Sequence, residues 1–184
     1  MEKYIGAIDS VTPAPFSPII VTFRTPVSLF FTNKRVIFAN IGYTEKGNIQ
    51  TALISFRIFL NKAATENVLK NKTSPKTLCN SNDKNFSIQY AAIQKIIIYS
   101  ENRFGLYTIR LVTYERDYNY YLLNAKTQND ITIMQYLSII KKALPNTEII
   151  QKSPHDTTVK FIIITGLISI IFGLLILLTF LLLL

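Results

Sequence analysis

Residues 29–38 read LFFTNKRVIF, and this short stretch decides the fold that we expect for the chain. Two apolar runs flank a polar Thr-Asn-Lys-Arg segment, which is typical of two β-strands joined by a tight turn. Asn33 and Lys34 occupy the turn, and asparagine tolerates the positive φ that tight turns require. We therefore predict a β-hairpin whose tip carries the positive charges of Lys34 and Arg35.

Further strand-length runs, rich in Ile, Val and Phe, lie on both sides of this hairpin. Such runs, bounded by Pro, Asn or Gly, favour β-strands. Most connections between them are too short for helical crossovers, so antiparallel pairing is expected. The predicted strands cover residues 19–23, 27–31, 35–40, 52–59, 86–90, 95–100, 105–112 and 118–124. The sequence thus predicts a mainly β domain.

Two segments depart from the strand pattern. Residues 1–18 contain three prolines near their end, which predicts an extended and irregular N-terminal segment. Residues 61–85 are rich in Lys, Asn, Ser and Thr, and we interpret them as an insertion loop. Asn61 is placed to cap a short helix there. Pro75 and the Asn-rich run after it indicate a mobile loop.

A helix is predicted over residues 130–144. Ile133, Leu137, Ile140 and Leu144 recur at spacings of four, three and four residues, which forms one apolar stripe suited to packing on a sheet. Residues 145–160 follow as a polar linker without a heptad pattern.

Residues 161–184 contain no charged side chain. As a helix this segment would extend roughly 36 Å, enough to cross a hydrocarbon core of about 30 Å. We predict a single C-terminal transmembrane helix that serves as a tail anchor. Lysines, Lys152 and Lys160 among them, precede the segment, and no basic residue follows it. This bias predicts membrane-surface positions for both lysines and a cytoplasmic N-terminal domain.

Small residues recur along the predicted span, and they would allow two helices to approach closely. Lone membrane spans also contain small residues, so self-association through this face is one of two open interpretations. The residues of this candidate helix-packing face are Thr165, Gly166, Ser169 and Gly173.

The residues that enzymes and metal sites need are scarce. His155 is the one histidine, Cys79 is the one cysteine, and glycine does not cluster. A zinc site, a Ser-His-Asp triad and a phosphate-binding glycine loop therefore cannot be assembled from them. We predict no catalytic residue, no cofactor and no metal, and hence a protein that is not an enzyme.

The order of elements and two local motifs resemble a known superfamily. LFFTNKRVIF is similar to an early strand-turn-strand segment of GRAM-like and bacterial or archaeal PH-like domains. FSIQYAAIQKIIIYS, at residues 86–100, is similar to a second motif of that group through Ile88, Tyr90, Ile93 and Ile96. The resemblance covers residues 19–144. It implies an antiparallel PH-like β-barrel with a C-terminal capping helix, acting as a non-enzymatic module that binds lipid headgroups or protein segments.

The formal net charge of +9 favours anionic partners. The candidate contacts are the basic residues of the hairpin tip and of the 61–85 segment: Lys34, Arg35, Lys70, Lys72 and Lys76. A solvated turn and a charged, soluble loop are the alternative interpretation of these residues. Nucleic acid is disfavoured, since Lys outnumbers Arg and the aromatic residues follow strand alternation.

These observations lead to two hypotheses of function. In the first, the chain is a membrane-anchored, non-enzymatic binding or adaptor module. It presents a cytoplasmic PH-like domain to anionic lipid headgroups or to a protein partner. In the alternative, it is an accessory structural subunit of a membrane protein complex, or a homodimer, that associates through the transmembrane helix.

Overall fold

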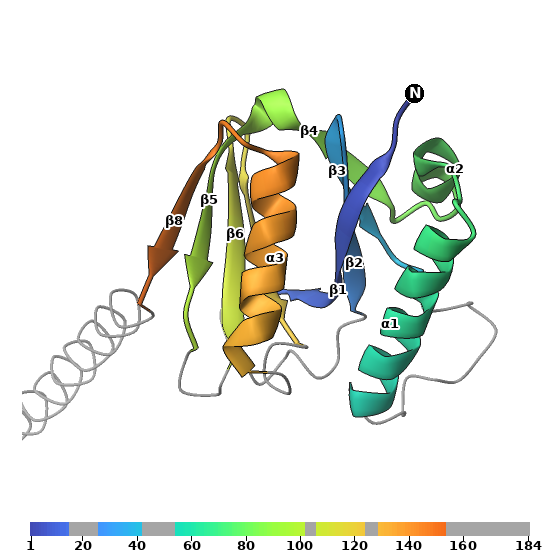
Figure 1. The fold of residues 1–184 in the computed structure, drawn as a ribbon, viewed down its shortest axis with the longest axis horizontal. Coiled ribbons are helices and arrows are strands. Elements are labelled where there is room, and N and C mark those ends of the chain that lie inside the picture. The colour runs from blue at the N-terminus through green and yellow to red at the C-terminus, as the bar shows by residue number, and fades with distance from the viewer. Residues whose placement is uncertain (15–25, 42–53, 102–105, 124–128, 154–184) are drawn as a thin grey trace, which may run out of the picture.

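The structure is a computed structural model that describes residues 1–14, 26–41, 54–101, 106–123 and 129–153. Figure 1 shows one sheet with helices packed on both of its faces. Its elements, in chain order, are β1 (Tyr4–Pro13), β2 (Val27–Thr32), β3 (Arg35–Ala39), α1 (Ile54–Lys70), α2 (Pro75–Asn80), β4 (Phe86–Gln89), the 3₁₀ turn η3 (Tyr90–Ala92), β5 (Ile93–Tyr99), β6 (Tyr107–Thr113), β7 (Asp117–Leu122), α3 (Asn129–Ala143) and β8 (Glu148–Lys152).

Strand β1 connects the two halves of the sheet. Its first part pairs with β2 and its last residues, from Val11 on, pair with β7. Val11 pairs with both strands, and the register with β2 shifts between Ile8 and Val11. Ser10 lies within this shift and has a φ of 54°. The Ser10 hydroxyl donates a hydrogen bond to the carbonyl of Ile58 in α1 at 3.2 Å. This contact helps to hold a backbone conformation that non-glycine residues rarely adopt.

The sheet contains eight strands in the order β4-β3-β2-β1-β7-β6-β5-β8. The prediction of a mainly β chain is confirmed, but the prediction of an antiparallel PH-like barrel is wrong on two points. First, β4 and β8 lie at opposite edges and do not pair with each other, so the described sheet is not closed. Second, β8 pairs in parallel with β5. Parallel pairing is possible because α3 supplies the crossover that returns the chain in the same direction.

The hairpin predicted from LFFTNKRVIF is confirmed as β2 and β3, whose residues pair from Ser28 with Ala39 to Phe31 with Val36. Both faces of this hairpin are buried. One face belongs to a core that also contains residues of α3 and the strands β5 to β7. On the other face, Phe30, Ile37 and Ala39 pack against Leu78 of α2 and against Val68 and Leu69 of α1. Such two-sided burial explains why both strands are continuous apolar runs.

The helix predicted over residues 130–144 is also confirmed, as α3. Leu137, Ile140 and Leu144 are buried in the large core, and Ile133 packs against it, as the apolar stripe predicted. The domain boundaries needed correction, however. The predicted linker contains β8, and the predicted irregular N-terminal segment contains β1.

The segment before β4 differs most from the prediction. Residues 52–59 were expected to form a strand, but α1 begins at Ile54, and α1 and α2 occupy much of the predicted loop. The outer face of β2 and β3 needs a cover, and these helices provide it. Ser74 caps α2 by accepting a hydrogen bond from the backbone N–H of Thr77, and Pro75 follows in the first turn. The predicted strand at 19–23 lies outside the described residues.

Buried polar groups join α1 to the sheet. The Asn61 side-chain amide donates to the Ser28 hydroxyl at 2.8 Å, and the hydroxyls of Ser28 and Thr65 lie 2.7 Å apart. All three side chains are almost fully excluded from solvent. Asn61 was predicted to cap a helix, but it lies inside α1, where these contacts fix the position of the helix on β2.

The predicted membrane location has to be corrected as well. Within the described ranges, no helix is long and apolar enough to cross a bilayer. The segment 161–184, with its candidate packing residues, lies outside the described residues. The single-pass, tail-anchored assignment and the cytoplasmic placement of the N-terminal domain have no support in the structure and are not retained.

Close packing of α3 on β1 gives a first prediction. A Cβ atom on Gly6 would lie 2.9 Å from Cγ1 and 3.0 Å from Cγ2 of Ile139. Overpacking of this kind costs about 1–3 kcal/mol, so Gly6→Ala should lower the free energy of unfolding within that range. Chemical denaturation measures the change. If the clash is the cause, the cost should shrink when Ile139→Ala is added; strictly additive effects of the two substitutions would contradict a clash between these residues.

Candidate functional site

The tip of the β2–β3 hairpin is tied to the first residues of the chain. The Asn33 side-chain oxygen accepts a hydrogen bond from the backbone N–H of Lys3 at 3.0 Å, and the Asn33 backbone N–H donates to the Lys3 carbonyl at 3.0 Å. The Thr32 hydroxyl accepts hydrogen bonds from the backbone N–H groups of Lys34 and Arg35 at 3.1 and 3.0 Å. The turn therefore has a fixed shape, set by side chains as well as by backbone.

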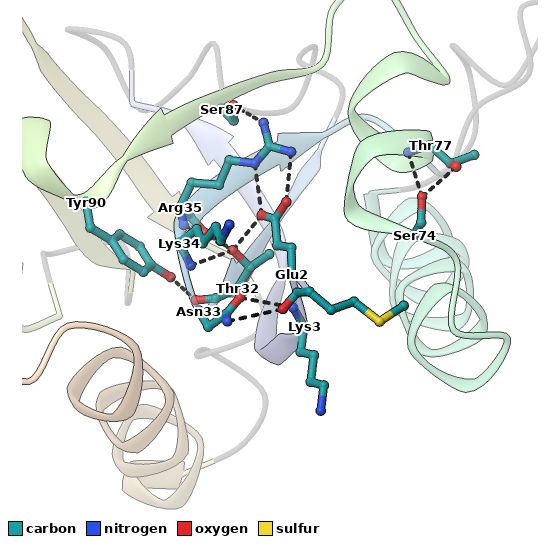
Figure 2. A network of polar contacts seen from close by, with 11 residues as sticks. Glu2, Lys3, Thr32, Asn33, Lys34, Arg35, Ser74, Thr77, Ser87 and Tyr90 are labelled. Carbon is teal, nitrogen blue, oxygen red and sulfur yellow. Dashed lines mark hydrogen bonds and ion pairs between the residues drawn. The ribbon is translucent and has the colours of Figure 1, made fainter.

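An ion pair beside this turn involves Arg35 and Glu2. The guanidinium donates to both carboxylate oxygens of Glu2, at 2.9 and 3.1 Å, and also to the hydroxyl of Ser87 at 3.1 Å. The Thr32 hydroxyl donates to the same carboxylate at 2.8 Å. Figure 2 shows Glu2 between Arg35 and Thr32. About four fifths of each charged side chain is buried, since only 19% and 18% are exposed. Arg35 is thus fully engaged within the fold.

Electrostatics of this pair follow from its geometry. Burial acts to raise the pKa of Glu2, but the hydrogen bonds from Arg35 and Thr32 and the nearby positive charges lower it more, so the pKa lies below its ordinary value. The hydrogen bond to Glu2 raises the pKa of Arg35 against the opposing effect of burial. Both groups therefore stay charged at neutral pH.

Tyr90, in η3, also belongs to this hydrogen-bond network. Its hydroxyl donates a hydrogen bond to the Thr32 carbonyl at 2.5 Å. Burial raises the pKa of Tyr90, and the charge of Glu2 adds to this effect, although the hydrogen bond to Thr32 opposes it. Tyr90 therefore acts as a neutral donor that connects the second half of the sheet to the hairpin turn. The sequence motif included Tyr90 but gave no indication of this partner.

The structure brings most of the predicted anion contacts to one end of the molecule. The small core beneath the hairpin includes Leu78 of α2. Val68 and Leu69, at the end of α1, and Tyr4 of β1 pack against it. Figure 1 shows this end, where the N-terminus, the β2–β3 turn, α2 and the end of α1 lie together. We call the exposed basic residues there the lysine end: Lys3, Lys34, Lys70, Lys72 and Lys76.

Not every predicted residue is available for a ligand. Arg35 is occupied by Glu2, and Lys70 lies 3.7 Å from Glu66 in an exposed pair. Within the described part of the chain, Lys3, Lys34, Lys72 and Lys76 form no ion pair. Sequence reasoning missed Lys3, because its approach to the hairpin tip depends on pairing of β1 with β2.

Lys152 lies away from the lysine end. It is the last residue of β8, opposite Tyr99 at the far end of β5. Since β5 begins next to η3 at the hairpin turn, Lys152 is at the other end of the sheet (Figure 1). Lys160 and His155 lie outside the described residues, so the structure does not test their predicted roles.

Two cavities lie on the described surface, and Lys3, Lys34, Lys72 and Lys76 line neither of them. One of about 200 Å³ lies between α1 and α3, over Ala7 and Asp9 of β1. The Tyr136 hydroxyl donates to Asp9 there at 3.0 Å. The second, of about 280 Å³, lies between α3 and the ends of β5 and β8. The described residues contain no group of three potential metal ligands.

Comparisons with known proteins do not assign the chain to a family. No protein-family model matches it, and no curated protein matches it. One similar solved structure is the hSac2 domain from the human phosphoinositide phosphatase Sac2. It covers 82% of this chain and 77% of its own, at 13% identity and a TM-score of 0.44. A likeness at this level carries no argument about this chain. It gives no support to the prediction that the protein is not an enzyme, and the PH-like resemblance stays a prediction.

The Glu2–Arg35 pair gives a prediction with a defined pH dependence. Because the pKa of Glu2 is lowered by folding, its contribution to stability is fully present above the ordinary value of 4.5 and is lost as pH falls through the folded value. At pH 7, Glu2→Gln should lower the free energy of unfolding by about 1 kcal/mol. This difference from the wild type should shrink as the pH is lowered below the ordinary value.

Denaturation at several pH values measures the effect. Glu115→Gln, at the exposed turn between β6 and β7, is the matched control and should change stability little at any pH. A difference between Glu2→Gln and wild type that stays constant from neutral to acid pH would contradict the assigned role of the carboxylate.

Proposed function

We propose that this chain is a non-enzymatic binding module that docks an acidic segment of a protein partner on its lysine end. The observation that carries the proposal is the set of exposed lysines on a rigid support. Lys34 belongs to a turn fixed by Asn33 and Thr32, and the backbone of Lys3 is hydrogen-bonded to that turn. Lys72 lies in the turn that follows α1, and Lys76 lies in α2; both helices pack beneath the hairpin.

The chemistry of the lysine end favours an extended acidic chain. Its free charges are ammonium groups, which attract carboxylates without requiring one fixed geometry. The guanidinium of Arg35, whose N–H groups would bind one anionic group in a fixed geometry, already binds Glu2. Neither of the two cavities described above is lined by Lys3, Lys34, Lys72 or Lys76, and recognition of a single small headgroup normally uses a pocket.

Two other functions are weaker candidates. Anionic lipid would be attracted by the same charges, and vesicle binding is therefore an outcome of the test below. An accessory subunit that associates through residues 161–184 stays a prediction, because that segment lies outside the described residues. The net charge of +9 supports any anionic partner and does not distinguish between them.

Charge reversal at the lysine end tests the proposal. Binding of the full chain to poly-L-glutamate should become at least about tenfold weaker in Lys34→Glu/Lys72→Glu, since two attractive contacts are replaced by repulsion. The affinity of the wild type should also fall as salt is raised. Fluorescence titration measures both effects.

The control variant is Lys62→Glu/Lys84→Glu, which changes the net charge equally at exposed positions outside the lysine end. It should bind poly-L-glutamate within about threefold of the wild type if local contacts decide the affinity. Equal loss in both variants would reduce the interaction to net charge. Preferential binding to vesicles that contain phosphatidylserine, with none to poly-L-glutamate, would overturn the protein-partner proposal in favour of a lipid surface.

A further inference from the structure

Strand β8 leaves one edge of the sheet open. It is the last strand in the sheet order, and no described residue pairs with its outer side. Its residues Glu148 and Lys152 are exposed, and Ile149 and Ile150 are half-exposed. Figure 1 shows β8 at the margin of the sheet, next to β5. An open edge of this kind presents unpaired backbone donors and acceptors that another strand can use.

The backbone groups that point outward can be identified. The Lys152 carbonyl accepts a hydrogen bond from the backbone N–H of Ser100 in β5 at 2.9 Å, so Lys152 directs its backbone groups toward β5. Backbone direction alternates along a strand. Ile150 and Glu148 therefore also face β5, whereas Ile149 and Gln151 direct their N–H and C=O groups to the open side.

The side chains of β8 are self-complementary. The strand reads EIIQK, with an acidic residue at its start, a basic residue at its end and Ile150 in the middle. In an antiparallel pair of two such strands centred on Ile150, each Glu148 lies opposite the Lys152 of the other copy. Ile149 then lies opposite Gln151, and these are the residues whose backbone groups face outward. The register that pairs opposite charges is thus also one that pairs the free hydrogen-bonding groups.

We propose that β8 is a homodimerisation surface, on which a second copy of this chain adds its own β8 in antiparallel orientation about Ile150. The sheet then continues across a two-fold axis, which is the commonest symmetry of soluble homodimers. The side chains of Glu148, Ile150 and Lys152 occupy non-hydrogen-bonded pairs, where opposed side chains approach most closely. The other edge strand, β4, reads FSIQ and contains no charge that would select a register.

Charge exchange is the main test. The full chain is kept in a mild detergent, because residues 161–184 are apolar, and its mass is measured by light scattering over a dilution series. The wild type should dimerise, with a concentration dependence that reflects the small interface. Glu148→Lys and Lys152→Glu should each shift the chain to the monomer, since each places like charges opposite one another. Glu148→Lys/Lys152→Glu should restore the dimer.

The exchange distinguishes the β8 edge from any other surface through which two copies could associate. Association through residues 161–184 would be indifferent to all three variants. Circular dichroism shows whether each variant is folded, so loss of the dimer with an unchanged spectrum is a surface effect. A monomeric wild type at every concentration, a dimer unchanged by both single reversals, or a folded double variant that stays monomeric would each overturn the proposal.

A covalent trap gives an independent measurement. At the two-fold axis the Cα atoms of the two Ile150 residues would lie about 4.5 Å apart, which a disulfide can bridge. In a Cys79→Ser background, Ile150→Cys should form a disulfide-linked dimer on mild oxidation. Ile149→Cys is the matched control and should not, because it faces Gln151 of the other copy. Equal cross-linking of both variants, or none in Ile150→Cys, would contradict the register.

Discussion

Burial of the β2–β3 hairpin on both faces is the constraint on which the rest of the structure depends. Phe31, Val36 and Phe38 contribute to the core under α3, and Phe30 and Ile37 contribute to the core under α1 and α2. A strand pair with two apolar faces is stable only if both are covered. Most of residues 54–80 therefore folds as the helices α1 and α2, and the polar contacts of Asn61 with Ser28 fix α1 on the sheet.

The turn of the same hairpin determines which charges are available for binding. Arg35 was a candidate ligand contact on sequence grounds, but its guanidinium belongs to Glu2 and Ser87 and helps to hold the N-terminus against the turn. This use of Arg35 leaves lysines as the free charges at that end. The proposed preference for an extended acidic chain follows from the geometry of the ion pair as much as from the net charge.

The two proposed surfaces lie at different places and depend on different residues. The lysine end is formed around the hairpin turn, whereas the dimer surface is the outer edge of β8 (Figure 1). Lys34 and Lys76 were found from the sequence because charge and turn pattern are local properties. Lys3 and the β8 edge were not found, because the first depends on pairing of β1 with β2 and the second on parallel pairing with β5.

The sequence by itself determined the β2–β3 hairpin, the strands β4 to β7, and helix α3 with its apolar stripe, because alternation, turn residues and helical spacing are local signals. Only the tertiary structure decided that residues from Ile54 on form a helix and not a strand, since short apolar runs are compatible with both. The apolar face of the hairpin that α3 does not cover is buried by this helix and by α2. The tertiary structure also decided that Glu148–Lys152 joins the sheet. Strand preference over five residues is too weak to form a strand without a partner, and here β8 forms by pairing with β5.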